Sequence, residues 1–411
     1  SIMLDTKWPE IRTWDLDEKL IVKKNNILKI YTNQSITPNN AIFCDYKNLS
    51  EDVDIWWKII IDSWLLEVEV LDKQKDYILT KTLNDWIIWS KRHINLPWVK
   101  LSLPWITPKD KKDIDFAIEN DFDFIAMSFV RNKKNIEELR EILKNHNSDI
   151  KIISKVENQE AIENLDEIVK FSDWIMIARW DLWIEVPIEK LPLYQKQIVN
   201  LCLEYWKIYI IATHLLETMI ENPFPTRAEV SDIYNWVLQK PDCLMLSWET
   251  AVWKYPIESV KIMSQTICEA EKNINYDYNC YSNDWLSIRD VEKKILIKHS
   301  LYICDKLNLN WVIILTKSWR LARLSAGFKP KPPIFSFTNN QKTHKFCNML
   351  FWIKSFILEN WWENYQKNLE NSIEILKQKS ILFSWDKVIW ITDIQKDSKE
   401  TSKEKAFNYD L

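Results

Sequence analysis

Short apolar runs alternate with amphipathic stretches through the middle of the chain, and the runs recur about every 30 residues, the length of one strand–helix unit. An uninterrupted apolar run is typical of a strand buried on both faces of a parallel sheet. Strands that alternate with helical stretches predict βα units. The five runs are Phe124–Val130, Ile150–Val156, Ile175–Ala178, Ile208–Ala212 and Cys243–Leu246.

Polar residues follow each of these runs. In a (β/α)₈ barrel the carboxyl ends of the strands meet at one face and carry the active site. We therefore expect an α/β fold with a TIM barrel, a helix that begins at Thr107, Pro108 and Asp110, and further helices over 158–169 and 226–237. The polar residues are Arg131, Glu157, Asn158, Arg179, Asp181, Thr213, His214, Ser247 and Glu249.

Two further regions have different patterns. Residues 8–103 alternate apolar and polar positions between turn signals, which predicts a small all-β lid, a β-barrel domain inserted into the TIM-barrel chain. Residues 275–284 have the composition of a linker, and 285–411 again alternate helices and strands, as in a separate α/β domain. The TIM barrel would then comprise 1–7 and 104–274. The charged segment Ile394–Asp410 is expected to be a mobile end.

The tryptophan and glycine contents are abnormal: 24 Trp and one Gly in 411 residues. About 7 % glycine, or roughly 29 residues, would be ordinary. The tryptophans occur beside Pro, Asp, Ser and Lys, which are turn contexts where glycine supplies positive φ and close backbone approach. We interpret most of the Trp letters as glycine, from a UGA codon that some bacterial lineages read as glycine. A truly Trp-rich protein is the alternative, although such chains place indoles on apolar faces.

The remaining composition excludes several classes of protein. The net charge of −4 provides no basic field for nucleic acid. Seven scattered cysteines without a CxxC pair favour a reduced, cytoplasmic compartment. No apolar run reaches the ~18 residues of a membrane span, we see no signal peptide, and the five histidines lack metal-ligand spacing.

Four strand-end residues suggest phosphoryl chemistry. The carboxylates of Glu157 and Asp181, on adjacent strands, could hold one Mg²⁺ and leave positions for phosphate oxygens. Lys155 could neutralise a phosphoryl group in transfer, and Thr213 offers a hydroxyl at the same mouth. In A-R-W-D-L-W, at 178–183, glycine in place of each Trp would let backbone N–H groups cradle an anion.

Read with glycine for Trp, long stretches of the chain resemble the pyruvate kinase family. They are M-L-D-T-K-W-P-E-I-R-T at 3–13, I-I-S-K-V-E-N-Q-E at 152–160, S-D-W-I-M-I-A-R-W-D-L-W-I-E-V-P at 172–187, P-T-R-A-E-V-S-D at 225–232 and M-L-S-W-E-T-A-V-W-K-Y-P at 245–256. The family has Gly at Trp8, Trp174, Trp180, Trp183, Trp248 and Trp253. It has no fixed Gly at Trp236, Trp311 or Trp390, which are therefore the tryptophans most open to being genuine.

The resemblance implies transfer of the phosphoryl group of phosphoenolpyruvate to ADP, giving ATP and pyruvate, with Mg²⁺ and K⁺ as cofactors. By position it makes Lys155 and Thr213 catalytic, and Glu157 and Asp181 the Mg²⁺ ligands. It assigns K⁺ to Asp5 and Thr6, substrate to Arg179, Trp180, Asp181 and Thr213, and nucleotide phosphates to Arg12 and Lys91. Glu10 matches potassium-requiring members. The loop with Thr316, Lys317, Ser318 and Arg320 resembles an allosteric site for a phosphorylated effector.

The chain also departs from the family. His214 stands where the family usually has Gln, and His93 where many members have Gly. The family has further N-terminal residues, including two barrel strands, so we expect an N-terminally incomplete sequence that is inactive as written. A homotetramer is expected at full length, without nucleic-acid or membrane partners.

Two other classes of function fit parts of the pattern. A metal-dependent aldolase or lyase acting on pyruvate-like acids would also use a Glu/Asp pair for Mg²⁺, but the lid and the last domain argue against it. A Trp-rich binding protein or decayed paralogue would keep the fold without its chemistry. Retention of Lys155, Glu157, Asp181 and Thr213 together argues against decay.

Overall fold

The computed structural model forms two compact units, Ile2–Ile198 and Val199–Leu411, the second of which also includes Ser1. The structure describes residues 1–7, 11–16, 18–32, 41–62, 64–97, 99, 105–251, 254–276, 286–359, 361, 365–394 and 403–410. Glu10, Trp8, Trp253 and nearly all of the expected linker lie outside these ranges.

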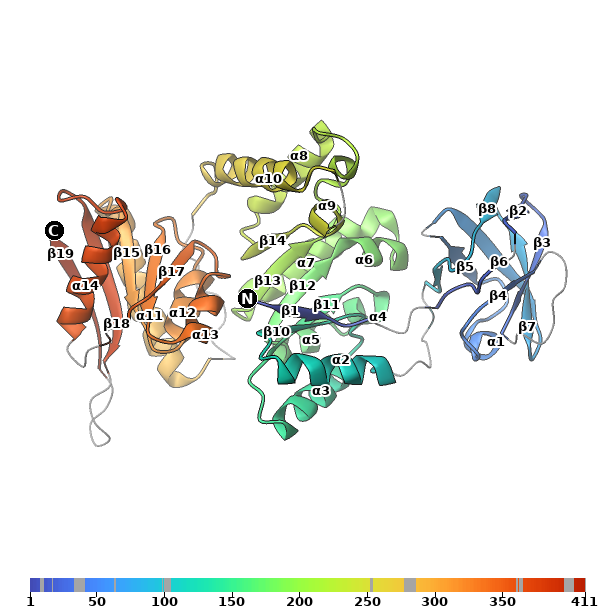
Figure 1. Ribbon diagram of the computed structural model, residues 1–411, viewed down its shortest axis with the longest axis horizontal. Coiled ribbons are helices and arrows are strands. Elements are labelled where there is room, and N and C mark those ends of the chain that lie inside the picture. Colours follow the sequence, from blue (N-terminus) through green and yellow to red (C-terminus); the bar gives the residue numbers. More distant parts are fainter. Residues whose placement is uncertain are drawn as a thin grey trace. The chain divides into compact units, whose positions relative to one another are not determined.

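Four parallel strands in the described part of the first unit pair in the order β1 (Met3–Asp5), β10 (Phe124–Met127), β11 (Lys151–Val156) and β12 (Trp174–Ala178). Of these, β10, β11 and β12 correspond to predicted apolar runs. Every residue of β10 and β12 is buried, as a strand covered on both faces requires. Helices follow the strands: α2 (Pro108–Glu119), α3 (Lys133–Asn145), α4 (Gln159–Glu163), α5 (Leu165–Phe171), α6 (Arg179–Glu185) and η1 (Ile188–Lys190) (Figure 1).

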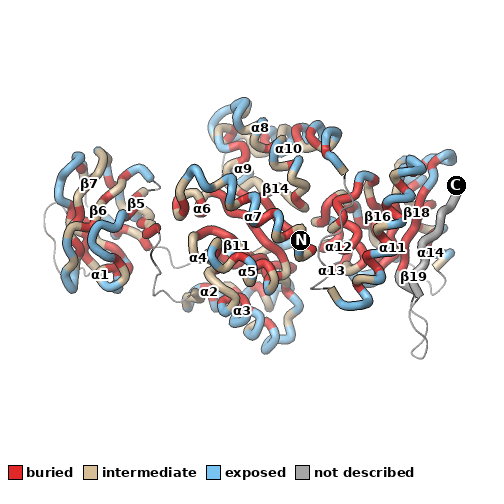
Figure 2. The backbone as a smooth tube through the Cα atoms, turned by 180° about the vertical axis from the view of Figure 1, so that it is seen from behind, coloured by how far each residue is buried: buried red, intermediate tan, exposed pale blue. Residues whose placement is uncertain are grey.

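The same strand–helix repeat continues in the second unit. Strands β13 (Ile208–Ala212) and β14 (Cys243–Met245) pair in parallel. Every residue of β13 is buried, and Figure 2 shows that α10 has exposed segments. The helices are α7 (Leu191–Glu204), which crosses from the first unit, η2 (Glu217–Ile220), α8 (Arg227–Val237), α9 (Trp248–Ala251) and α10 (Pro256–Glu271).

Local sequence explains where these helices begin and break. Thr107 caps α2 and Thr226 caps α8, each in a reciprocal capping box with the acidic residue three positions on. The single helix predicted over 158–169 is wrong in one respect: the structure has two helices that meet at Asn164. The Asn164 amide side chain donates to the Arg131 carbonyl at 3.0 Å, a bond across to the preceding strand end.

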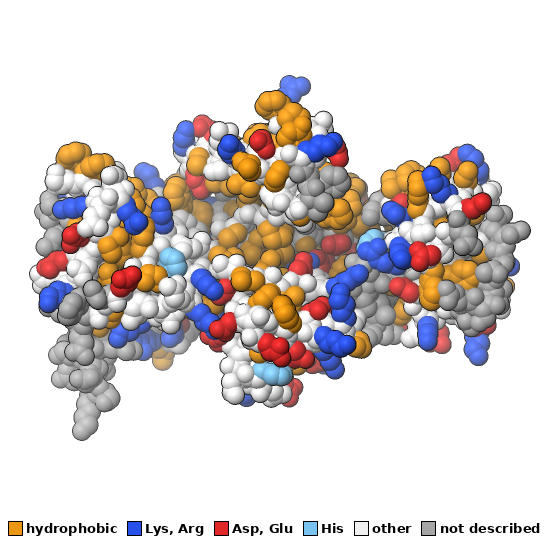
Figure 3. All heavy atoms as spheres, in the orientation of Figure 1, with side chains coloured by type: hydrophobic (Ala, Val, Ile, Leu, Met, Phe, Trp, Pro, Cys, Tyr) orange, Lys and Arg blue, Asp and Glu red, His pale blue; other side chains and the backbone are white. Residues whose placement is uncertain are grey.

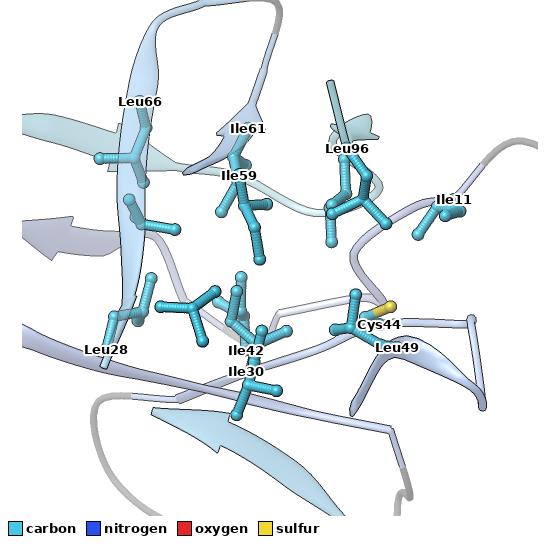
Figure 4. Close-up of a cluster of buried hydrophobic side chains, with 14 of the residues drawn as sticks. Ile11, Leu28, Ile30, Ile42, Cys44, Leu49, Ile59, Ile61, Leu66 and Leu96 are labelled. Carbon is cyan, nitrogen blue, oxygen red and sulfur yellow. The ribbon is translucent and has the colours of Figure 1, made fainter. Parts of the chain in front are cut away.

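The region expected to form the lid is built from strands. Its main sheet has the order β4-β3-β7-β6-β5-β9, and β2 pairs with β8. The core is a cluster of aliphatic side chains that point toward one another, among them Leu28, Ile42, Ile59 and Leu66 (Figure 4). The elements are β2 (Leu20–Val22), β3 (Ile27–Tyr31), β4 (Ala41–Phe43), α1 (Leu49–Asp52), β5 (Lys58–Ile61), β6 (Leu66–Lys73), β7 (Tyr77–Thr82), β8 (Trp86–Ile88) and β9 (Ile94–Asn95).

The C-terminal region is an α/β sheet of strand order β17-β16-β15-β18-β19. All pairs are parallel except β18 with β19. Its elements are α11 (Ile288–Lys306), β15 (Trp311–Leu315), α12 (Arg320–Gly327), β16 (Ile334–Thr338), α13 (Gln341–Cys347), β17 (Ile353–Ile357), α14 (Tyr365–Gln378), β18 (Lys387–Ile394) and β19 (Lys403–Asp410).

The expected mobile end at Ile394–Asp410 is wrong for its last part. Strand β19 pairs antiparallel with β18 over eight residues of each strand. The unpaired backbone N–H and C=O groups of an edge strand can form hydrogen bonds with another segment, whatever the polarity of that segment's side chains. A polar composition therefore did not prevent strand formation here.

Four of the tryptophans that the structure describes have the backbone conformation that favours glycine. Their φ angles are 74° at Trp56, 71° at Trp64, 56° at Trp206 and 57° at Trp352. A bulky L-residue in this region is an outlier. Trp206 follows α7 at the position where helices often end on glycine, and the Lys207 N–H closes the turn on the Cys202 carbonyl. These positions support the interpretation of Trp as glycine, which stays a prediction.

Among the described residues, the indole nitrogens of Trp174 and Trp311 bear on the same question. Both Nε1 atoms are buried in this part of the chain without a hydrogen-bond partner. An unpaired buried donor costs about 1–3 kcal/mol. The observation counts against a genuine tryptophan at both positions, including Trp311, which the sequence had left open. Trp390, in contrast, packs into the core of the C-terminal sheet.

The surface in view carries charges of both signs, interspersed over the face (Figure 3). Among the described residues, no helix combines the length and apolarity that a membrane crossing needs.

Candidate functional site

Lys155 and Glu157 lie at the carboxyl end of β11, and their side chains form an ion pair. The distance from Lys155 Nζ to Glu157 Oε1 is 2.9 Å, and the Glu157 side chain is fully buried. A second carboxylate, that of Asp5 at the end of β1, lies 3.2 Å from the same ammonium group. Because β1, β10 and β11 are parallel neighbours, their ends bring these three side chains together.

The electrostatics of this group depend on burial. Burial by itself would lower the pKa of Lys155, but the carboxylates of Glu157 and Asp5 outweigh it and raise that pKa. Lys155 is therefore cationic at every physiological pH. Burial raises the pKa of Glu157, and burial together with Glu157 raises the pKa of Asp181 to about 8.

Glu157 and Asp181 form a donor set that suits Mg²⁺. Their carboxyl groups are hydrogen-bonded to each other, an arrangement in which two buried like charges share a proton. A divalent cation can replace that proton and hold the two carboxylates together. Mg²⁺ normally uses one or two carboxylates and keeps several waters. Consistently, the described residues contain no cluster of three or more His, Cys, Asp or Glu side chains around one point.

Ser128 is a member of this site that the sequence did not indicate. Its Oγ lies 2.9 Å from Lys155 Nζ, 2.8 Å from the Thr6 carbonyl oxygen and 3.2 Å from Asp5 Oδ1. Its backbone N–H donates to Thr6 Oγ1 at 3.1 Å. The run Phe124–Val130 was interpreted as one strand, whereas β10 ends at Met127 and a turn places Ser128 in the site.

The residue after Ser128 has an unusual backbone. Phe129 has φ of 50°, and its N–H donates to Glu157 Oε2 at 2.6 Å. A non-glycine residue in this region costs of order 1–3 kcal/mol and is concentrated at functional sites. The turn thus orients the Glu157 carboxylate through the main chain, which no side-chain pattern could have revealed.

Arg179, Trp180 and Asp181 lie together at the start of α6. Arg179 is buried. The indoles of Trp180 and Trp183 are in edge contact, with centroids 5.9 Å apart. Asp181 interacts electrostatically with both Lys155 and Glu157, so three of the predicted phosphoryl-transfer residues share one site.

Thr213 follows β13 in the second unit. Thr213 and His214 both have positive φ, 67° and 52°, so the chain turns sharply where the strand ends. The buried Glu249 carboxylate fastens this turn, since it accepts the N–H groups of Leu216 at 3.2 Å and Ser247 at 2.8 Å. His214 Nε2 lies 3.7 Å from Glu217 Oε2.

The two residues predicted to contact nucleotide phosphates are neighbours in the lid. Arg12 donates through Nη1 to the Lys91 carbonyl at 2.9 Å, and its Nη2 lies 2.6 Å from His93 Nε2. Lys91 Nζ pairs with Asp15 at 3.3 Å, with both side chains largely exposed. The side chains of Arg12 and Lys91 therefore lie on one patch of the lid. His93, which stands where many family members have Gly, is part of the same patch.

The predicted effector loop follows β15. The Thr316 hydroxyl donates to the Ser318 carbonyl, and the Lys317 carbonyl accepts from Thr343 Oγ1 at 3.3 Å. Arg320 makes a two-pronged contact with Asp290, at 2.6 Å from Nε and 2.5 Å from Nη2. An effector phosphate would have to compete with Asp290 for this guanidinium.

Comparison with known proteins agrees with this geometry. Residues 1–260 match the family model for the pyruvate kinase barrel domain, and residues 295–403 match that for the pyruvate kinase alpha/beta domain. These matches confirm the predicted fold class, a (β/α)₈ barrel with a C-terminal α/β domain. They also favour a phosphotransferase over an aldolase, a lyase or a binding protein.

Individual relatives cover nearly the whole chain. A pyruvate kinase from Borreliella burgdorferi is 36 % identical over 393 residues, which are 95 % of this chain and 82 % of the relative. One from Eimeria tenella is 35 % identical over 97 % of this chain and 76 % of its own. A crystal structure of a pyruvate kinase from Cryptosporidium parvum superposes with a TM-score of 0.88 at 32 % identity, covering 98 % of this chain and 83 % of that one.

Proposed function

The chain belongs to the pyruvate kinase family, and we propose on that premise which of its residues perform the transfer of the phosphoryl group of phosphoenolpyruvate to ADP. The observation that carries the assignment is the buried group of Lys155, Glu157 and Asp181, one permanent cation beside two carboxylates. Phosphoryl transfer of this kind needs positioning and charge neutralisation more than covalent help. The site contains the groups for both.

Each residue then has a distinct role. Lys155 neutralises the charge that develops on the phosphoryl oxygens as they pass between the two substrates. Arg179, Asp181 and the backbone at position 180 bind phosphoenolpyruvate. Thr213 directs protonation of the enolpyruvate carbon, with ordered water as the proton source. Arg12 and Lys91 hold the nucleotide phosphates.

Glu157 and Asp181 would hold Mg²⁺, which would supply positive charge to neutralise the phosphate oxygens. Asp5 and Thr6 would hold K⁺, in agreement with the glutamate at position 10, which lies outside the described residues. The protein's own part is to hold the two carboxyl groups close together beside Lys155, where a bound cation would displace the proton that they share. Burial in the site supplies the low dielectric that strengthens these interactions.

The test is enzymatic. Full-length protein with glycine at the recoded positions should make pyruvate from phosphoenolpyruvate and ADP, with activity dependent on Mg²⁺ and K⁺. Lys155→Met should lower kcat by about 10²–10³-fold, the usual cost of one transition-state donor. The matched control is Lys151→Met at the other end of β11, which should stay near the wild-type rate. Full activity of the Lys155→Met variant would show that Lys155 has no role in phosphoryl transfer.

We also propose the finer properties that the resemblance implies. Helices α10 and α11 expose several large apolar side chains, which a homotetramer could cover: Ile257, Val260, Ile288, Ile295 and Tyr302. Light scattering at several concentrations tests the tetramer. A cytoplasmic location agrees with the scattered free cysteines, of which Cys44, Cys202, Cys304 and Cys347 are buried. A phosphorylated effector at 316–320 stays a proposal, tested by adding sugar phosphates to the assay.

A further inference from the structure

The hydroxyl group of Ser128 connects two parts of the site that have different tasks. On one side it accepts a hydrogen bond from Lys155 Nζ at 2.9 Å. On the other side it donates to the Thr6 carbonyl oxygen at 2.8 Å, with Asp5 Oδ1 within 3.2 Å. A serine hydroxyl has one proton and two lone pairs, so it can accept and donate at the same time.

We propose that Ser128 is a positioning residue that couples the monovalent cation at Asp5 and Thr6 to the orientation of Lys155. The inference rests on the proposed K⁺ site and deepens it, since it names the group through which that site acts on the phosphoryl-transfer lysine.

The coupling follows from how the partners are shared. Lys155 Nζ contacts Asp5 at 3.2 Å and 3.4 Å, so a cation bound by Asp5 competes with the lysine for this carboxylate. Ser128 is the neutral partner that Lys155 keeps in either case. The Thr6 carbonyl has two lone pairs and can accept from Ser128 while it binds a cation. The position of the cation therefore determines the position of the Thr6 carbonyl oxygen. That oxygen orients the Ser128 hydroxyl group, which in turn orients the Lys155 ammonium group.

The surrounding backbone makes this hydroxyl a fixed element of the site. Ser128 is 8 % exposed, and its N–H is tied to Thr6 Oγ1 at 3.1 Å. The next residue, Phe129, is held at φ of 50° with its N–H on Glu157 at 2.6 Å. One two-residue turn thus contacts both proposed cation ligands, the lysine and a proposed Mg²⁺ ligand.

The experiment measures a binding coupling as well as a rate. Equilibrium dialysis with Mn²⁺ present gives the dissociation constant of phosphoenolpyruvate with K⁺ and with tetramethylammonium in its place. The ratio of the two constants is the coupling factor. In Ser128→Ala this factor should fall roughly 3- to 10-fold, the net contribution of one ordinary hydrogen bond. Ser128→Thr, which keeps the hydroxyl, should restore most of it.

Ser154→Ala is the matched control. Ser154 is on β11 next to Lys155, is fully buried, and bonds to Ser172 Oγ at 2.6 Å instead of to the site. Its coupling factor should equal that of the wild type, although its stability falls. If Ser128→Ala does not fold, Ser128→Cys replaces it, because a thiol is a weak donor and acceptor.

Each outcome decides the question. A wild-type coupling factor in Ser128→Ala, or an equal loss in Ser154→Ala, would overturn the relay while leaving the K⁺ site standing. A wild-type enzyme indifferent to K⁺ would overturn the K⁺ proposal and the relay with it. Loss in Ser128→Ala, recovery in Ser128→Thr and no change in Ser154→Ala support the relay.

Discussion

Gly327, the single glycine of the chain, lies directly against the indole of Trp206: a β-carbon added to Gly327 would come within 2.3 Å of Cε3 of that ring. Trp206 itself has φ of 56°. The indole therefore has a backbone that suits glycine and a neighbour that can be nothing larger than glycine.

Two predictions follow for this pair, one for each identity of residue 206. If position 206 is glycine in the natural protein, Gly327→Ala has free space at the last residue of α12, and stability should be unchanged or rise by up to about 1 kcal/mol. If position 206 is tryptophan, the same substitution should cost at least ~1–3 kcal/mol from overpacking. Intact-mass and peptide mass spectrometry identify residue 206 independently, and urea unfolding measures the effect.

Metal affinity should depend on the protonation of Asp181. Burial and the Glu157 carboxylate raise the pKa of Asp181 to about 8, and a proton there competes with a divalent cation. Mn²⁺ affinity should therefore rise from about pH 6 to pH 8 and then level off, with protons released on binding at the lower end. Calorimetry in buffers of different ionisation enthalpy counts these protons. Affinity that is flat over this range would contradict the assignment.

The same raised pKa has a consequence for folding without metal. The native protein keeps a proton on Asp181 that the unfolded chain releases near pH 4, so this residue's contribution to stability falls as the pH rises from about 4 to 8. The Asp181→Asn variant has no titrating group at this position, so its free energy of unfolding should not show this dependence on pH. Denaturant unfolding at several pH values compares the two proteins.

A buried ion pair in the second unit should dominate local stability. Lys329 Nζ lies 2.7 Å from Asp242 Oδ2, with side chains 5 % and 2 % exposed. The carboxylate also accepts the N–H groups of Tyr209 at 3.2 Å and Phe351 at 3.1 Å, and so joins the β13–β14 region to the C-terminal sheet. Lys329→Met leaves that charge buried and unpaired, and should cost about 3–5 kcal/mol.

The control for this prediction is Lys331→Met. Lys331 pairs with Asp305 at 3.6 Å and is 60 % exposed, so its loss should be barely measurable. Equal effects of the two substitutions on the urea midpoint would show that the buried pair has no special role.

The contact between Arg320 and Asp290 should leave an acid-dependent signature. Burial would raise the pKa of Asp290, but hydrogen bonds from Arg320 outweigh it and lower that pKa. The pair therefore stabilises the fold above about pH 4 and stops doing so as the pH falls through the lowered pKa. Arg320→Gln should be less stable than the wild type at neutral pH and converge with it in acid.

Thermal unfolding across this pH range measures the convergence. Lys23→Gln, which removes the exposed pair with Asp85 at 3.2 Å, serves as the reference. A constant gap between Arg320→Gln and the wild type down to the lowest pH would assign the effect to packing instead of charge.

Much of the barrel and of the site was predictable from periodicity. The apolar runs ending before Glu157 and Thr213 correspond to β11 and β13, because a strand buried on both faces is mostly apolar. Ser128 was missed by the same rule, since the run that contains it continues in apolar letters to Val130 although the strand ends at Met127. Likewise β19 was missed because its pairing depends on the backbone of β18.

The amino-acid order by itself determined the strand–helix repeat, the placement of Lys155, Glu157, Asp181 and Thr213 at strand ends, and the abnormal distribution of tryptophan. These follow from side-chain polarity at regular spacing, which is a local property. Only the tertiary structure decided which groups touch Lys155, that Phe129 turns its N–H toward Glu157, and that Trp206 covers Gly327. Such contacts join residues that are far apart in the chain. They depend on main-chain angles and on burial, and the local sequence pattern predicts neither of these.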